Sequence, residues 1–276
     1  CDTNWIATLS AIIHSNLTPV FVDANYKTWC IDPKEIEKKI SKKTKLIIVT
    51  HLYGNIANIK EIIKIAKKHK IFVIEDAAQA LGSSFKGKMC GTFADIGCYS
   101  FHGSKIITTG EGGMIVTKNK KIFERCKILS NHGRELKKHH SFISSRIGFK
   151  FKMTNLQAAL GISQLKRLDK NIKKKEYIFK LYKKHLGKIA FQTNLNFKMS
   201  INSYWMTNIV FDSKYRVNIK KLIKFLQKFN IQSRPFFPPL SMMKMFNKIP
   251  QKNSLKLYEN SINLPSSLNL TKSEIV

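Results

Sequence analysis

The sequence predicts an α/β protein with a large domain built on a mostly parallel sheet and a smaller α+β domain at the C-terminal end. Two observations lead to this prediction. In the first half, short apolar segments alternate with segments of helical periodicity, which is typical of parallel strands joined by helices on both faces of a sheet. Beyond residue 190, the pattern changes to short strands, one helix and a proline-rich loop.

The first elements of the predicted sheet come early in the chain. The segment PVFVD (19–23) is typical of a short strand. A helix follows, because Asp32 can cap it, Pro33 suits its first turn, and Ile36 and Ile40 share one face.

The next elements continue the alternation. KLIIVTHL (45–52) is typical of a buried strand, NIKEIIKIAKKHK (58–70) of an amphipathic helix, and IFVIED (71–76) of a third strand. The side chains expected to face inward from this helix are Ile59, Ile62, Ile63 and Ala66. The series predicts a β-α-β-α-β unit.

Two close strands are predicted near 95–101 and 112–117, followed by a helix from about Lys120 to Leu129. From Met153 the pattern predicts one long helix, with Thr154 as a possible cap.

The C-terminal elements are shorter and predict a separate unit. Short strands are expected within 203–211, a helix at 218–228 and a loop at 233–240. We therefore predict a large domain at residues 1–165. The small domain, which includes the long connecting helix, is predicted at 166–276.

The charge of the chain is unusual but is spread out. The 276 residues include 49 Lys and Arg against 17 Asp and Glu, a formal charge of +32. The lysines alternate with Ile and Asn along almost the whole chain and do not cluster with aromatic residues. We therefore expect no nucleic-acid partner, whereas anionic small molecules such as phosphates suit a positive field.

Cysteine spacing and hydropathy narrow the class of protein further. The five cysteines form no CxxC pair, which indicates reduced thiols in a cytoplasmic protein rather than a disulfide framework or a zinc site. No apolar run approaches the roughly 18 residues of a membrane span, so no membrane association is expected.

Chemistry-bearing residues follow two of the predicted strands. In open α/β sheets ligands bind at the carboxyl ends of the strands, and Glu75 and Asp76 stand at such an end. Adjacent strand residues point to opposite faces, so only one of the two is expected to serve a ligand. Lys105 lies past the next strand, where it is either a surface lysine or a desolvated amine that attacks carbonyls. Ser100 is either an anion ligand or an ordinary strand residue.

Two further segments have simpler interpretations. TGEGG (109–113) is predicted to be a tight turn, because a Walker A pattern is absent. His132, His139 and His140 lie in a charged loop without metal-ligand spacing, so no metal site is expected.

A family resemblance covers nearly the whole chain. VIEDAAQALGSSFKGKMCGTFADIGCYSFHGSK followed by TTGEGGMIVT resembles the DegT-type sugar-nucleotide aminotransferases, which are pyridoxal 5′-phosphate (PLP) enzymes of fold type I. The likeness continues, in the family's order, through TNWIATLSAIIHSNLTPVFVD, THLYGN, LSNHGRE, KMTNLQAALGISQL, SRPFFPPL and INLPSSLNLT. Within the family the chain looks most like the 4-aminotransferases that make perosamine-type sugars.

The resemblance implies roles for five residues around PLP. Lys105 matches the lysine that forms a Schiff base with the cofactor and carries protons. Asp76 matches the carboxylate that keeps the pyridine nitrogen protonated, so that the ring accepts electrons. Gln79 matches the residue beside the phenolic oxygen, Ser100 a phosphate ligand, and Trp5 the aromatic residue that stacks on the ring.

Weaker implications concern the phosphate and the substrate. Lys150 stands where relatives often carry an Asn that reaches the phosphate of the neighbouring protomer, and Lys152 is close by. The resemblance also implies substrate-binding roles for His51, His132 and Arg234.

Together these features predict transfer of an amino group from L-glutamate to a 4-keto-6-deoxy nucleotide sugar, for O-antigen or other surface glycans. The expected assembly is a homodimer with a shared active site. One alternative is a related dehydratase, which has a histidine in place of Lys105. Another is an inactive remnant with a binding role, because relatives carry a segment before TNWIAT with a Ser-Gly-Thr turn for the phosphate, and continue beyond LTKSEIV into a final helix. For that reason the chain alone is expected to bind PLP weakly.

Overall fold

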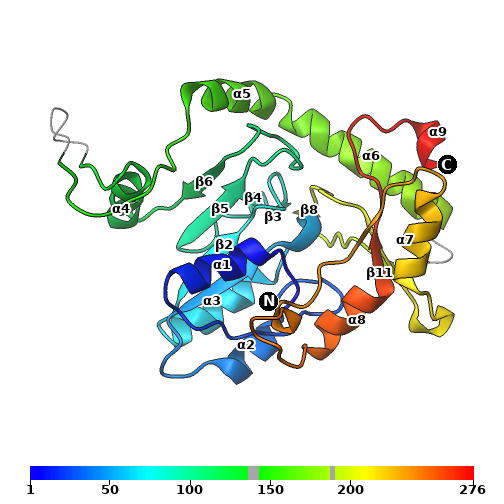
Figure 1. The fold of residues 1–276 in the computed structure, drawn as a ribbon, viewed down its shortest axis with the longest axis horizontal. Helices are drawn as coiled ribbons and strands as arrows, with labels where there is room; N and C mark the ends of the chain where they lie inside the picture. The colour runs from blue at the N-terminus through cyan, green and yellow to red at the C-terminus, as the bar shows by residue number, and fades with distance from the viewer. Residues whose placement is uncertain (136–142, 187–189) are drawn as a thin grey trace.

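The computed structural model describes residues 1–135, 143–186 and 190–276. In this part of the chain, helices surround three sheets (Figure 1). The α-helices are α1 (Ile6–His14), α2 (Pro33–Lys39), α3 (Ile59–Lys68), α4 (Lys120–Ser130), α5 (Asn155–Leu165), α6 (Leu168–Leu186), α7 (Ile219–Gln227), α8 (Lys252–Asn260) and α9 (Lys272–Ile275). The 3-10 helices are η1 (Leu52–Gly54), η2 (Ser213–Tyr215) and η3 (Leu240–Met242).

The main sheet confirms the predicted mostly parallel arrangement. Its strands are β1 (Leu46–Thr50), β2 (Phe72–Asp76), β5 (Ile96–Ser100) and β6 (Gly113–Val116), in the order β1-β2-β5-β6. The first three run parallel and β6 is antiparallel to β5. Because Thr50 pairs with Asp76, and Asp76 with Cys98, the carboxyl ends of the three parallel strands lie at one edge of the sheet.

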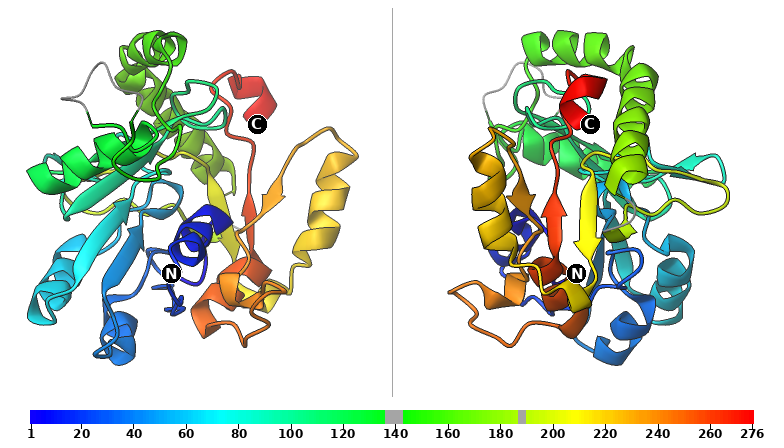
Figure 2. Two further views of the ribbon diagram at one scale, coloured as in Figure 1. Left: turned by 60° about the vertical axis from the view of Figure 1, so that its left-hand side comes forward. Right: turned by 90° about the vertical axis from the view of Figure 1, so that its right-hand side faces the viewer.

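A second, antiparallel sheet forms the C-terminal part of the molecule. Its strands are β10 (Arg234–Pro235), β11 (Ser261–Asn263), β9 (Asn208–Phe211) and β7 (Ala190–Thr193), in that order. Figure 2 shows α7 on one side of this sheet and α1 between it and the main sheet. The predicted boundary at residues 165 and 166 stays a prediction.

A third, small sheet joins the two halves of the chain. It consists of β4 (Lys88–Met89), β3 (Ser84–Phe85) and β8 (Ser200–Ile201), in that order. Since β3 precedes and β8 follows the long α6, this pairing ties the chain before β5 to the C-terminal part.

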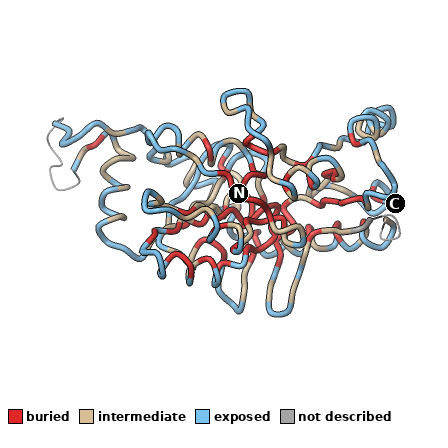
Figure 3. The backbone as a smooth tube through the Cα atoms, turned by 90° about the horizontal axis from the view of Figure 1, so that it is seen from below, coloured by how far each residue is buried: buried red, intermediate tan, exposed pale blue. Residues whose placement is uncertain are grey.

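Burial is uneven along the molecule. Buried segments gather around its middle, whereas the region of α4 at the left end is largely exposed (Figure 3). Neither α4 nor α5 contains a buried residue. No described helix is long and apolar enough to cross a membrane.

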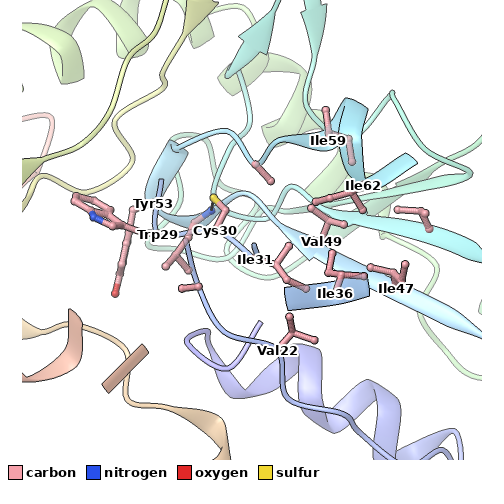
Figure 4. Close-up of a cluster of buried hydrophobic side chains, with 14 of the residues drawn as sticks. Val22, Trp29, Cys30, Ile31, Ile36, Ile47, Val49, Tyr53, Ile59 and Ile62 are labelled. Carbon is pink, nitrogen blue, oxygen red and sulfur yellow. Dashed lines mark hydrogen bonds between the residues drawn. The ribbon is translucent and has the colours of Figure 1, made fainter. Parts of the chain in front are cut away.

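The largest apolar cluster includes side chains of the β1 and β2 strands and extends to Phe236 and Leu257 in the C-terminal part. In Figure 4, Trp29 and Tyr53 lie at one end of this cluster, and Ile47 and Ile62 lie toward the other. The residues of α3 that are buried are Ile59, Ile62, Ile65 and Ala66, so the apolar face is turned slightly from the predicted one, and Ile63 is only partly buried.

Local capping follows the sequence. The Asp32 carboxylate accepts a hydrogen bond from the Lys34 amide at the start of α2, and Pro33 stands in the first turn, as predicted. Thr154 and Gln157 form a capping box at the start of α5, which confirms the cap predicted there.

Two predicted elements were wrong. Residues 19–23 are extended but join no sheet, because the Val22 carbonyl accepts from the Asp2 amide instead of a neighbouring strand. The long helix from Met153 is two helices, since α5 ends before Lys166 and α6 starts at Leu168. The apolar side chains of α5 stay exposed, whereas α6 turns to bury Ile178 and other residues.

Candidate active site

At the carboxyl edge of the main sheet, hydroxyl groups of neighbouring residues surround the Asp76 carboxylate. The Asp76 Oδ2 accepts hydrogen bonds from Thr8 Oγ1 at 2.7 Å and Thr50 Oγ1 at 3.3 Å, and Oδ1 accepts from the Ala78 amide at 3.1 Å. Thr50 reaches Asp76 because the two residues pair in the parallel register of β1 and β2. Thr8 comes from α1, so this helix and the sheet edge together orient the carboxylate.

Asn4 connects this carboxylate to two other predicted site residues. Its Nδ2 donates to both Thr8 Oγ1 and Thr50 Oγ1 at 2.8 Å, and its Oδ1 accepts from the Trp5 amide at 2.8 Å and from Gln79 Nε2 at 3.3 Å. Asn4 is almost fully buried. A single amide group therefore fixes the relative positions of the carboxylate, the predicted stacking residue and Gln79.

The orientation of the Gln79 amide is fixed from both ends. Its Oε1 accepts from the Tyr53 amide at 3.0 Å, while its Nε2 donates to Asn4. Tyr53 holds its N–H in this direction from a left-handed backbone conformation, with φ of 55°. Since the Gln79 Oε1 is held by the Tyr53 amide, the orientation of the side-chain amide is fixed. The Gln79 Nε2 has a second N–H, which it can donate toward the sheet edge.

Lys105 lies in the loop between β5 and β6 and is partly buried. Its Nζ lies 3.8 Å from the centroid of the Trp205 ring. Burial lowers the pKa of Lys105 to about 8, although the negative charge of Asp76 acts in the opposite direction. A larger share of these amines is therefore neutral near pH 7.5 than for an ordinary lysine, whose pKa is about 10.4. The side chain can act as a nucleophile near neutral pH.

The neighbouring carboxylate, Glu75, points to the other face and has a structural role. It is fully buried and accepts hydrogen bonds from the amides of Gly91, Phe93 and Ala94 and from His51 Nε2. Burial by itself would raise the pKa of Glu75, but these donors outweigh it and hold the pKa below its usual value. Glu75 thus anchors the turn that leads into β5.

The placement of His51 does not suit the substrate-binding role predicted for it. His51 is fully buried, its Nε2 contacts Glu75 at 3.0 Å, and its Nδ1 accepts from the Ala57 amide at 3.1 Å. A side chain with both ring nitrogens engaged and no exposed surface has nothing to offer a substrate, so we leave His51 out of the proposed site.

The remaining predicted residues of this region are more open. The Trp5 side chain is 59% exposed, and its ring lies 5.9 Å from that of Phe237. Ser100 ends β5, and its Oγ accepts from the His102 amide at 3.4 Å. Arg234 is exposed on β10, three residues before Phe237. Hydrogen bonds through Asn4, Thr8 and Thr50 thus link Trp5, Asp76 and Gln79. Lys105 contacts Trp205 and is near enough to Asp76 for the two charges to interact, and Ser100 ends β5 at the same edge.

His132 and Lys150 lie elsewhere. The His132 amide donates to the Phe149 carbonyl at 2.9 Å, and Asn131 pairs with Lys150 in an isolated bridge. These segments follow α4, which lies at the end of the molecule away from the C-terminal sheet (Figure 1). His139 and His140 lie outside the described residues. Among those that are described, no three His, Cys, Asp or Glu side chains are grouped so that they could hold a metal ion.

Sequence reasoning missed the residues that support this site. Thr50 ends a parallel strand as Asp76 does, so the strand-end rule could have found it. Asn4 and Thr8 stand in the segment TNWIATLSAIIHSNLTPVFVD, in which only the likeness to relatives gave a signal. Trp205 carried no signal, because an apolar residue near a strand is ordinarily part of the core.

The chain resembles known proteins along its whole length. The sequence profile of the DegT/DnrJ/EryC1/StrS aminotransferase family matches residues 1–276. The GDP-perosamine synthase of Escherichia coli O157:H7 is 38% identical over 274 residues, which are 99% of this chain and 74% of that protein. The GDP-perosamine synthase of Vibrio cholerae is 34% identical over 266 residues, or 95% of this chain and 72% of that protein.

Solved structures have the same fold. Helicobacter pylori PseC, an aminotransferase involved in the biosynthesis of pseudoaminic acid, superposes with a TM-score of 0.94 at 28% identity, covering 99% of this chain and 75% of that one. The PLP form of Spr1654 from Streptococcus pneumoniae gives a TM-score of 0.90 at 25% identity, covering 99% of this chain and 76% of that one.

Proposed function

The chain belongs to the DegT/DnrJ/EryC1/StrS aminotransferase family and is a PLP-dependent sugar aminotransferase, and from that premise we propose that it moves an amino group from L-glutamate to a 4-keto-6-deoxy nucleotide sugar. The observation that carries the proposal is the position of the Lys105 amine, which lies after β5 against the Trp205 ring, where the charge of Asp76 at the carboxyl edge of the sheet acts on it.

The side chains at this edge fit PLP. When bound, PLP supplies an aldehyde that condenses with amines and a pyridine ring that accepts electrons. The Asp76 carboxylate, oriented by Thr8 and Thr50, is suited to hold a proton on the ring nitrogen. The Gln79 amide offers an N–H to the phenolic oxygen. The exposed face of Trp5 offers a surface for stacking, and Ser100 a hydroxyl for the phosphate.

Lys105 has two tasks in this proposal. With PLP bound, its neutral amine would serve as the nucleophile toward the cofactor aldehyde, and as a free amine it would move a proton at the substrate carbon that gains or loses nitrogen. Both tasks need a group that is neutral part of the time near pH 7 to 8. The lowered pKa of Lys105 meets this need.

The names of the relatives support a GDP-linked substrate. Two of them are GDP-perosamine synthases, and perosamine is a 4-amino sugar of the class predicted from the sequence. In the proposed reaction the sugar ketone becomes an amine and glutamate becomes 2-oxoglutarate, so nitrogen and electrons balance. The product would serve O-antigen or other surface glycans. The five free cysteines are in keeping with a reducing, cytoplasmic location.

We expect the enzyme to aminate the GDP-linked 4-keto-6-deoxy sugar that corresponds to perosamine with a kcat/KM at least about tenfold above that for a dTDP-linked 4-keto-6-deoxy sugar, the preference that roughly 1.4 kcal/mol of base recognition gives. Mass spectrometry of the sugar nucleotide and coupled detection of 2-oxoglutarate would measure both reactions. Equal kcat/KM values for the two sugars, or a higher value for the dTDP-linked sugar, would contradict the proposal that the substrate is GDP-linked. Absence of the 4-amino product from either sugar would contradict the proposed reaction.

A homodimer with a shared active site is also proposed. Large apolar side chains are exposed together on α5 and the segment before it, where Leu156 is 85% and Phe151 74% exposed. Exposed apolar patches of this kind mark protein interfaces. His132 and Lys150 belong to the same end of the molecule, so a partner chain seated there could receive them near its own cofactor phosphate.

Replacing Leu156 with glutamate is expected to shift the protein from dimer to monomer, because it places a charge in the proposed apolar contact. Sedimentation velocity would measure the assembly. Phe225→Glu is the matched control, since Phe225 is an equally apolar, exposed side chain on α7, outside the patch. A wild-type monomer at tens of micromolar, or a Leu156→Glu dimer as tight as the Phe225→Glu dimer, would contradict this interface.

A further inference from the structure

Trp205 contacts the reactive amine on one side and the loop backbone on the other. The Lys105 Nζ lies 3.8 Å from the centroid of the Trp205 ring, well within the range of a cation–π interaction. The indole Nε1–H donates to the Ser104 carbonyl at 2.7 Å. The same side chain therefore holds both the amine of Lys105 and the peptide that precedes it.

The position of Trp205 is itself fixed by several contacts. Its carbonyl accepts from Lys175 Nζ at 3.0 Å, and Lys175, a buried side chain of α6, also donates to the Ser266 carbonyl. The ring of Tyr53 stacks on Trp205 with centroids 6.0 Å apart and an interplanar angle of 19°. The indole is buried. It can therefore act as a rigid surface rather than as a side chain that follows Lys105.

Trp205 also belongs to a row of aromatic rings that crosses the candidate site. Tyr53 stacks on Phe237 at 4.9 Å, and Phe237 lies 5.9 Å from Trp5. The row begins at the Lys105 amine and ends at the proposed stacking residue. Trp205 is the member of this row that contacts the Lys105 amine.

We propose that Trp205 is a positioning residue that holds the protonated amine of Lys105 on the π face of its indole whenever that amine is not bonded to the cofactor. The inference rests on the role proposed above for Lys105. A lysine that carries protons must be held near the reacting carbon in its charged form as well, and a buried ammonium needs a partner. The indole face supplies one without a competing negative charge.

The interactions of the other charged groups near the Lys105 amine are as follows. The Asp76 carboxylate acts on Lys105 and favours its charged form. The Lys175 Nζ donates to the Trp205 carbonyl at 3.0 Å. His102 and Glu111 in the same loop face each other, with Nε2 and Oε1 3.6 Å apart. None of these groups is altered in the variants described next.

The test compares Trp205→Phe with Trp205→Leu in the full chain after removal of the cofactor. Both variants lose the bond to Ser104, but only phenylalanine keeps a π face. Competitive acetylation with peptide mass spectrometry measures the pH at which half of the Lys105 amines are protonated, which is called the Lys105 midpoint below. We expect the midpoint of the Leu variant to lie below that of the Phe variant by about 0.4 to 1.5 pH units, which is the proton-affinity change of one cation–π contact. A Leu midpoint equal to or above the Phe midpoint would overturn the proposal.

Replacing Trp205 with fluorinated tryptophan provides a second test, in which the shape of the side chain is kept. Fluorine withdraws charge from the ring face and keeps the Nε1–H, so each added fluorine is expected to lower the Lys105 midpoint further. A midpoint that does not respond to fluorine would also overturn the proposal. Borohydride reduction of the PLP-loaded enzyme tests the proposed function separately, since cofactor found on another lysine would contradict the role of Lys105 without altering these midpoints.

Discussion

Replacing Lys105 with alanine is expected to lower transamination by at least about a thousandfold. The substitution removes the amine proposed to bond to the cofactor aldehyde, which is also the group proposed to move the proton. Loss of a proton-transferring side chain alone typically costs about a hundredfold to ten-thousandfold. The fold should persist, because Lys105 is only partly buried in the loop between β5 and β6 and the substitution removes a single contact with the Trp205 ring.

Steady-state turnover and circular dichroism would measure the two effects. Lys180→Ala is the matched control, because Lys180 is an exposed lysine of α6 that pairs only across the helix surface with Glu176. In the wild-type protein, borohydride reduction followed by peptide mapping should place the cofactor on the peptide that contains Lys105. Normal turnover in Lys105→Ala, or reduced cofactor on a different lysine, would show that the assignment is wrong.

The parallel core of the fold could be predicted because each element carried its own signal. The strands β1 and β2 and the helix α3 lie within two residues of their predicted ends, since apolar runs and helical periodicity mark them directly. The break between α5 and α6 could not be predicted in this way. Lys166 and Arg167 are good helix formers, and the chain turns there because α6 packs on the C-terminal part while α5 does not.

The candidate site could be predicted only in part, because only some of its residues carry a signal in the sequence itself. Opposite faces of a strand distinguish Glu75 from Asp76, as the sequence indicated, but only the structure says which carboxylate is buried against the turn at Gly91. Asn4 could not be found from its sequence position. Its importance comes from four hydrogen bonds to residues between one and 75 positions away, and such contacts exist only once the chain has folded.

The Asp76→Asn variant is expected to lose several orders of magnitude in kcat while its stability changes little. Asparagine has the size of aspartate, and the hydroxyls of Thr8 and Thr50 can accept as well as donate, so both contacts can persist when they rotate. What disappears is the negative charge proposed to hold a proton on the pyridine nitrogen. Each tenfold loss in rate corresponds to about 1.4 kcal/mol of lost transition-state stabilisation.

The matched comparison for this variant is Glu75→Gln, because it makes the same chemical change at the next residue on the opposite face. The Glu75 carboxylate accepts four hydrogen bonds in the core, so glutamine there should lower the midpoint of denaturant unfolding and leave kcat of the folded enzyme within about tenfold of wild type. Urea titrations and active-site-normalised kcat values would separate the two effects. If Asp76→Asn keeps kcat within a few fold of wild type, or if both variants lose kcat and stability together, the charge of Asp76 has no special role. The opposite pattern, kcat lost at position 76 and stability lost at position 75, would assign the chemistry to the carboxylate that Asn4, Thr8 and Thr50 orient.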